Sequence, residues 1–141
     1  MAIKWTNEQK DAIDAKGSVI VTAAAGSGKT AVLVERVIER LCDSNNPISA
    51  DRLLIVTFTK AAAAEMRLRI EKRLAQKIDE EPNNINYLKQ QLLISSADIC
   101  TIDSFCIKLI RNHFSELGIS PDFKIADPIV EEKIKKEISR F

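Results

Sequence analysis

The stretch TAAAGSGKTAV, residues 22–32, constrains the fold of this chain more than any other feature. It contains AAAGSGKT, which matches the spacing of a phosphate-binding P-loop except that Ala23 stands at the first glycine position. The residues immediately before it, SVIV, favour a buried strand, and the residues after it have helical periodicity. A strand, a glycine-rich turn and a helix in this order are the context that phosphate binding requires. The alternative is a glycine-rich turn that only closes a strand–helix unit.

Phosphate binding explains the residue types in this turn. Gly26 and Gly28 allow the backbone to turn so that successive N–H groups converge on phosphate oxygens without obstruction by Cβ atoms. Lys29 places a positive charge against the β and γ phosphates, and Thr30 offers its hydroxyl to Mg²⁺ at a helix start that favours an anion. Lys29 and Thr30 are therefore the predicted catalytic residues, with Thr30 as the magnesium ligand. The predicted nucleotide-binding residues of the loop are Ala23, Ala24, Ala25, Gly26, Ser27, Gly28, Lys29, Thr30 and Ala31.

Composition limits the class of protein. A chain of 141 residues with 45% hydrophobic residues can bury the core of one ordinary domain. Lys plus Arg number 21 and Asp plus Glu number 20, so any binding of a polyanion must be local. Three cysteines without a zinc-binding spacing favour a reducing, cytoplasmic compartment. No apolar run approaches the roughly 20 residues that span a bilayer, so no membrane partner is expected.

The pattern of apolar residues predicts an α/β fold with a parallel sheet and flanking helices. Strands are expected at 18–22, 53–57 and 98–102, and helices at 6–15, 30–42, 60–78, around 85–92 and at 104–117. The expected buried faces are Leu33, Val37 and Leu41; Met66, Ile70, Leu74 and Ile78; Ile85, Leu88 and Leu92; and Phe105, Leu109, Ile110 and Phe114. Thr6 and Gln9 have the spacing of a capping box at the first helix.

The C-terminal residues predict one more helix. Asp127 and Pro128 suit its N-cap and first turn. Glu131 and Glu132 precede Lys135 and Lys136 by four residues, and the predicted apolar face consists of Val130, Ile134, Ile138 and Phe141. Because no stop signal follows, the expectation is either a bare helix end or a chain cut inside a larger protein.

Four segments in order resemble one family of motor proteins. WTNEQKDAI, AAAGSGKT, VTFTKAAAAEMRLRI and ICTIDSFCIKLIRNHF look like the N-terminal end of superfamily 1 DNA helicases of the UvrD, Rep and RecB kind. The ending FKIADPIVEE is most similar to the AddA branch of bacterial helicase/nuclease complexes. The resemblance implies a RecA-like P-loop NTPase fold, with residues 1–126 as part of motor domain 1A and 127–141 as the start of a helical insertion.

The same resemblance implies a function for the intact protein. It would be an ATP-dependent DNA helicase and nuclease subunit that couples ATP hydrolysis to translocation on single-stranded DNA and to unwinding during double-strand break repair. ATP and Mg²⁺ are the implied cofactors, single-stranded and duplex DNA the substrates, and a second, AddB-like protein the partner. The chain alone is expected to bind nucleotide weakly and to be nearly inactive, because the acidic pair and the arginines that complete catalysis would lie elsewhere.

Site residues also follow from the resemblance. Gln9 would read the adenine edge, since an amide both donates and accepts. The implied DNA contacts are Thr57, Phe58, Thr59, Lys60, Thr101, Ser104 and Phe105. Phe58 could stack on a base. The alternative interpretation is that its ring is buried in the hydrophobic core. The sequence departs from the family where Lys60 and Ala61 replace Asn and Lys, and where Asp103 replaces His.

Other interpretations stay open at this point. ICTID also resembles a strand that ends in a magnesium-binding carboxylate, in which case Asp103 would serve a small P-loop kinase or a nucleotide sensor. His113 has no clustered ligands and is expected to be structural. Arg67 and Arg69 are expected on a solvated helix face rather than in a DNA-binding patch.

Overall fold

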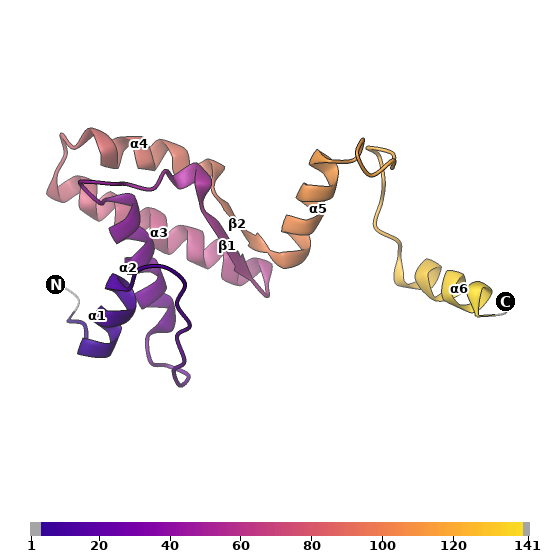
Figure 1. Ribbon diagram of the computed structural model, residues 1–141, viewed down its shortest axis with the longest axis horizontal. Helices are drawn as coiled ribbons and strands as arrows, with labels where there is room; N and C mark the ends of the chain where they lie inside the picture. The colour runs from indigo at the N-terminus through magenta and orange to yellow at the C-terminus, as the bar shows by residue number, and fades with distance from the viewer. Residues whose placement is uncertain (1–3, 140–141) are drawn as a thin grey trace. The chain divides into compact units, whose positions relative to one another are not determined.

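The computed structural model describes residues 4–139, which form two compact units. The first unit runs to Phe105 and the second begins at Cys106, so the boundary falls within one helix. The elements in chain order are α1 (Asn7–Asp14), α2 (Lys29–Leu41), η1 (Ala50–Arg52), β1 (Leu54–Thr57), α3 (Lys60–Glu80), α4 (Ile85–Leu93), η2 (Ile94–Ser96), β2 (Asp98–Thr101), α5 (Ile102–Asn112) and α6 (Pro128–Ile138) (Figure 1). The fold of the first unit is α/β, as the sequence predicted.

The first unit contains a two-stranded parallel sheet, with β1 beside β2 and α3 against them (Figure 1). Ile55 and Ile99 are register partners and both are buried, on the side where α3 packs against the strands. Leu54 and Val56 point to the other face and are exposed. The parallel arrangement is confirmed. Among residues 4–139, however, a helix packs on only one face of the sheet.

The predicted strand at 18–22 is wrong for the described chain. From Val19 to Ala24 the chain forms no helix, turn or paired strand, and the Ile20 side chain is 95% exposed. Three consecutive β-branched residues are typical of a strand covered on both faces. Local preference does not make a strand, because its stability comes from backbone pairing and side-chain contacts with neighbours. Within residues 4–139 the segment lacks such a neighbour.

Helix starts follow the predicted local chemistry. Thr6 and Gln9 form the capping box of α1, as the sequence indicated. The Thr59 hydroxyl accepts a hydrogen bond from the N–H of Ala62 at the start of α3. Asp127 caps α6 in the predicted way. Such contacts depend on residues two or three apart, so the sequence alone is enough to predict them.

The core joins α2, α3 and the sheet. Its buried members are Val34, Val37, Ile38, Leu41, Ala50, Ile55, Met66, Ile70, Leu74, Ile94, Ala97 and Ile99. The predicted face of α3 is therefore confirmed, with Ile78 partly buried beside it. Two predicted faces need correction. Leu33 of α2 is 39% exposed while Val34 and Ile38 are buried, and α4 buries Tyr87 and Gln90 instead of its exposed Ile85, Leu88 and Leu92.

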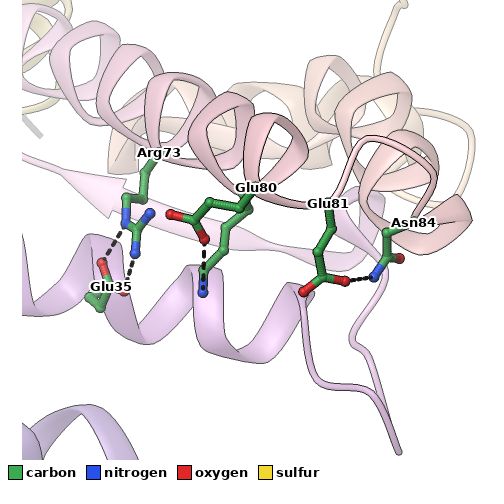
Figure 2. Close-up of polar contacts among 6 residues, drawn as sticks. Glu35, Arg73, Glu80, Glu81 and Asn84 are labelled. Atoms are coloured by element: carbon green, nitrogen blue, oxygen red, sulfur yellow. Dashed lines mark hydrogen bonds and ion pairs between the residues drawn. The ribbon is translucent and has the colours of Figure 1, made fainter. Parts of the chain in front are cut away.

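The helices α2 and α3 run side by side in the same direction. Glu35 of α2 faces Arg73 of α3 (Figure 2), and Ala31 lines the same surface cleft as Arg69. Glu35 lies six residues after the start of α2, and Arg73 lies 13 residues after the start of α3. At 1.5 Å per residue, α3 therefore begins roughly 10 Å before α2 along the shared direction. The loops that precede the two helices consequently open toward the same end of the unit.

A buried amide network fixes the other end of these helices. Gln90 is almost fully buried, and its Oε1 accepts a hydrogen bond of 2.8 Å from the N–H of Ala50. Its Nε2 donates to Asn86, whose own amide donates to the carbonyl of Leu41. One set of hydrogen bonds thus provides partners for the last carbonyl of α2, for the first N–H of η1 and for two side-chain amides of α4.

The second unit consists of the rest of α5, a turn and α6. The helix α5 ends at Asn112 and not at the predicted residue 117, and the residues that follow form turns. None of the residues of α5 or α6 is buried. Phe105, Ile110 and Phe114 of the first predicted apolar face are partly covered, whereas Val130, Ile134 and Ile138 of the second are exposed. The predicted pairs of Glu131 with Lys135 and of Glu132 with Lys136 are present. Phe141 lies outside the described residues.

Within residues 4–139, none of the helices combines the length and apolar character needed to cross a bilayer.

Candidate functional site

The glycine-rich loop turns at its two glycines, although the strand expected before it is absent from the described residues. Gly26 and Gly28 have φ values of +78° and +86°, which side chains other than glycine rarely adopt. Residues 23–27 are exposed, so solvent reaches the loop. Gly28 is also the N-cap of α2, and no side chain accepts a hydrogen bond from the first turn. The first N–H groups of α2 are therefore available to an anion.

Lys29 reaches back across this loop. Its Nζ donates hydrogen bonds of 2.7 Å each to the carbonyls of Ala23 and Ala24. The ammonium thus lies at the concave side of the turn, where it is expected to meet phosphate oxygens. Thr30 follows at the start of α2 and is exposed, as a hydroxyl that takes part in magnesium binding must be.

Gln9 approaches the same loop from α1. Its Nε2 donates a hydrogen bond of 3.1 Å to the carbonyl of Ser27. A cleft of about 600 Å³ includes Gln9, Ser27 and Lys29 in its lining, together with apolar residues of the segment 19–23. The structure therefore brings the predicted adenine reader and the predicted phosphate-binding residues into one place, although they are far apart in sequence.

The second group of predicted site residues lies where the two strands end. Thr57 of β1 and Thr101 of β2 are register partners at the carboxyl edge of the parallel sheet. Phe58 follows Thr57 and its ring is fully exposed, which excludes the core position that was its alternative. Phe105 of α5 is half-buried. Two segments separated by more than 40 residues thus meet at one edge.

The hydroxyl groups at this edge differ in what they can still bind. Thr57 donates its hydroxyl hydrogen to the carbonyl of Thr59, so its main role is to hold the turn. Thr59 uses its oxygen to cap α3 and keeps its hydroxyl hydrogen for another acceptor. Thr101 and Ser104 share a hydrogen bond of 2.9 Å between their hydroxyls, so one of the two hydrogens points elsewhere. Each segment therefore retains a hydroxyl donor.

A groove of about 470 Å³ connects these residues. Lys60, Thr101 and Ser104 all contribute to its lining between α3 and β2. Arg67 lies in the same groove, half-buried, and donates to the carbonyls of Ile94 and Ala97 at 2.7 and 2.8 Å. The prediction of a solvated face is therefore wrong for Arg67. The sequence offered no signal for this, because its acceptors are backbone carbonyls about 30 residues away.

The remaining candidates from the sequence, Asp103, His113 and Arg69, lie outside the two groups of site residues described above. Asp103 is exposed in the first turn of α5, after β2 has ended, and so it does not stand at the strand terminus where the kinase interpretation needs it. His113 pairs with Glu116 through Nδ1 at 2.9 Å, in accordance with a structural role. Arg69 is exposed and pairs with Glu65, as expected for a solvated face. In the described part of the chain, no three His, Cys, Asp or Glu side chains form a metal-binding group.

Comparison with known proteins identifies the family to which this arrangement is similar. The sequence matches the UvrD/REP helicase N-terminal domain family over residues 5–140. It is 50% identical over 135 residues to the AddA protein of the ATP-dependent helicase/nuclease of Lachnoclostridium phytofermentans, covering 95% of this chain and 10% of that protein. The proteins of the same name from Acetivibrio thermocellus and Listeria welshimeri are 49% and 47% identical, each over 95% of this chain and 11% of their own length. The chain thus spans about a tenth of these relatives.

Proposed function

Because this chain belongs to the UvrD/REP helicase N-terminal domain family, we propose that it forms the ATP-binding and first strand-binding part of a DNA helicase. In that role it uses ATP hydrolysis, in a larger protein, to drive movement along single-stranded DNA. Two features of the first unit support this role. One is the phosphate-binding loop before α2, and the other is the exposed edge before α3.

The residues of the loop fit a triphosphate. The positive φ values of Gly26 and Gly28 turn the backbone as a phosphate cradle requires, and α2 begins without a side-chain cap. Lys29 would exchange its contacts with two loop carbonyls for contacts with the β and γ phosphates. Such an exchange replaces neutral acceptors with charged ones, which form stronger hydrogen bonds.

Magnesium would be bound jointly with the nucleotide. The loop would offer the Thr30 hydroxyl as a ligand, and the described residues hold no cluster of three His, Cys, Asp or Glu side chains that could bind the ion. The other ligands would be phosphate oxygens, and carboxylates from outside this segment would orient the ion. Magnesium prefers such mixed coordination, with few protein ligands and phosphate oxygens.

The DNA strand would lie across the edge formed by Phe58 and the groove beside it. The exposed Phe58 ring offers a face on which one base can stack, and Lys60 supplies a positive charge next to it. Thr59 and the Thr101–Ser104 pair would donate to phosphate oxygens. This placement agrees with the near-neutral charge of the chain, since the binding surface is local.

For the intact protein we propose the role named for its relatives, that of an ATP-dependent helicase/nuclease subunit of the AddA type. We further propose, beyond what those names say, that it acts on DNA with a second protein in double-strand break repair. The chain alone would bind ATP or ADP weakly and would not unwind duplex DNA, because catalytic groups supplied by the rest of the protein are needed.

The observation that carries the proposal is the common direction of α2 and α3, which opens the phosphate loop and the Phe58 edge toward the same end of the unit. The test is ATP hydrolysis by the full-length protein that contains this chain, measured with and without single-stranded DNA. Stimulation by DNA supports a motor. Binding without turnover would instead indicate a sensor, and phosphate transfer to a small acceptor would indicate a kinase.

A further inference from the structure

The carboxamide of Gln9 contacts two elements at once. Its Oε1 accepts a hydrogen bond of 3.0 Å from the N–H of Thr6, which completes the capping box of α1. Its Nε2 donates a hydrogen bond of 3.1 Å to the carbonyl of Ser27, 18 residues away in the phosphate-binding loop. One side chain therefore connects the first turn of α1 to the backbone of the loop.

The Ser27 carbonyl determines where a neighbouring N–H group points. It belongs to the same peptide unit as the N–H of Gly28, and in a planar trans peptide these two groups point in opposite directions. When Gln9 holds the carbonyl toward α1, the Gly28 N–H is directed away from α1. Gly28 is the N-cap of α2, so this is the side from which an anion approaches the helix.

Lys29 contacts the loop at another point and with the opposite effect. It holds the carbonyls of Ala23 and Ala24, so the N–H groups of the residues that follow each of them point away from its ammonium. Lys29 must release these contacts when phosphate binds, whereas the neutral amide of Gln9 can keep its contact with the Ser27 carbonyl. Gln9 is therefore the contact suited to keep the loop in its binding conformation throughout.

Close packing supports a specific fit between Gln9 and this turn. A Cβ atom at Gly28 would lie 3.1 Å from Nε2 of Gln9, whereas a Cβ at Gly26 would meet no heavy atom within 4 Å. Glycine at 28 is thus needed both for its φ of +86° and for the approach of the Gln9 amide.

We propose that Gln9 is a positioning residue for the phosphate-binding loop, so that it strengthens binding of the phosphate chain whatever base is attached. This inference rests on the proposed nucleotide site. It adds to the adenine-reading role, because the amide keeps one N–H and one oxygen lone pair beyond the two contacts described. The two roles differ in their response to a ligand that has no base.

The test uses inorganic tripolyphosphate and ATP, each with magnesium, and the full-length protein that contains this chain. Gln9→Glu keeps an acceptor for the Thr6 N–H but places an acceptor against the Ser27 carbonyl. The expected result is a rise of about three- to tenfold in the Kd of tripolyphosphate, measured by calorimetry, as for the loss of one hydrogen bond. The KM for ATP should rise by at least the same factor while kcat is retained.

Two matched variants separate positioning from charge and from stability. Asn7→Asp adds the same charge to the same turn of α1 without a contact to Ser27. Thr6→Ala removes the capping hydroxyl but leaves both contacts of the Gln9 side chain, so it lowers the melting temperature without raising the Kd of tripolyphosphate. If either variant raises this Kd as much as Gln9→Glu does, the positioning role is refuted.

Two further results would be decisive. An unchanged Kd for tripolyphosphate together with weaker ATP binding would overturn the inference, and it would leave Gln9 as a base reader only. If the unsubstituted protein bound neither tripolyphosphate nor ATP, the proposed nucleotide site itself would fail, and the inference would fail with it.

Discussion

Arg73 of α3 holds Glu35 of α2 through two parallel hydrogen bonds, each 2.9 Å long, from Nε and Nη2 to the two carboxylate oxygens (Figure 2). The side chains are 21% and 8% exposed, so water screens the pair only weakly. The hydrogen bonds that Arg73 donates to Glu35 raise the pKa of the Arg73 guanidinium above its ordinary value. The pair therefore fixes how α2 and α3 lie against each other, and hence how far apart their first residues are.

Replacing Arg73 by methionine is expected to lower the free energy of unfolding by about 1.5–3 kcal/mol, because Glu35 is left buried without its charged donor. Urea denaturation measures this change. Arg69→Met is the matched control, because Arg69 forms an exposed pair with Glu65 and its loss should cost less than about 1 kcal/mol. Equal losses of unfolding free energy in the two variants would show that the Glu35–Arg73 pair stabilises the fold no more than an exposed pair does.

Gly28→Ala is expected to weaken nucleotide binding at least tenfold. The new Cβ meets Nε2 of Gln9 at 3.1 Å and the residue must keep a φ of +86°, so the loop has to change its shape. Gly17→Ala is the control, since Gly17 also has a positive φ, of +72°, but an added Cβ meets nothing within 4 Å. That variant should lose stability, by about 1 kcal/mol, and keep its affinity. Fluorescent ATP analogues give both affinities.

Phe58→Ala should leave the free energy of unfolding unchanged, because the ring is fully exposed. It should weaken binding of single-stranded DNA by about 1–3 kcal/mol, the usual contribution of one stacked base. Fluorescence anisotropy in the full-length protein measures the affinity. Leu92→Ala, at an exposed position on α4, is expected to change neither property. A large loss of stability in Phe58→Ala would mean that the ring belongs to a core.

Burial raises the pKa of the Cys42 thiol from 9.0 to about 11, with a smaller opposing effect of Lys77. Between these two values the unfolded chain loses the thiol proton while the folded chain keeps it. The free energy of unfolding should therefore fall as pH rises from about 9 to 11, and be unaffected by this group below that range. Urea denaturation of the unsubstituted protein and of Cys42→Ala isolates the contribution. An identical pH dependence in both would contradict it.

Local chemistry accounts for what the sequence predicted well. The capping box of Thr6 and Gln9 and the positive φ values of Gly26 and Gly28 depend on a few adjacent residues. The strands around Ile55 and Ile99 were predictable because each is a short apolar run and the segment between them contains helices, which favours parallel pairing.

Contacts between distant segments account for what the sequence did not predict. Leu33 and Val34 are both apolar, and the position of α3 decides which of them is buried. The buried amide of Gln90 has its partner 40 residues away. Because that partner cannot be read from the local sequence, a polar side chain here would be expected at the surface. Arg67 was misplaced for the same reason.

The open sheet has a practical consequence for handling the isolated polypeptide. Each strand of a two-stranded sheet has one outer edge along which another strand can pair, and here the exposed Leu54 and Val56 belong to β1. Ile20 adds an apolar extended segment that is also uncovered. Concentrated solutions of this polypeptide should thus self-associate by adding strands across molecules, and charged substitutions at Val56 or Ile20 should keep it monomeric.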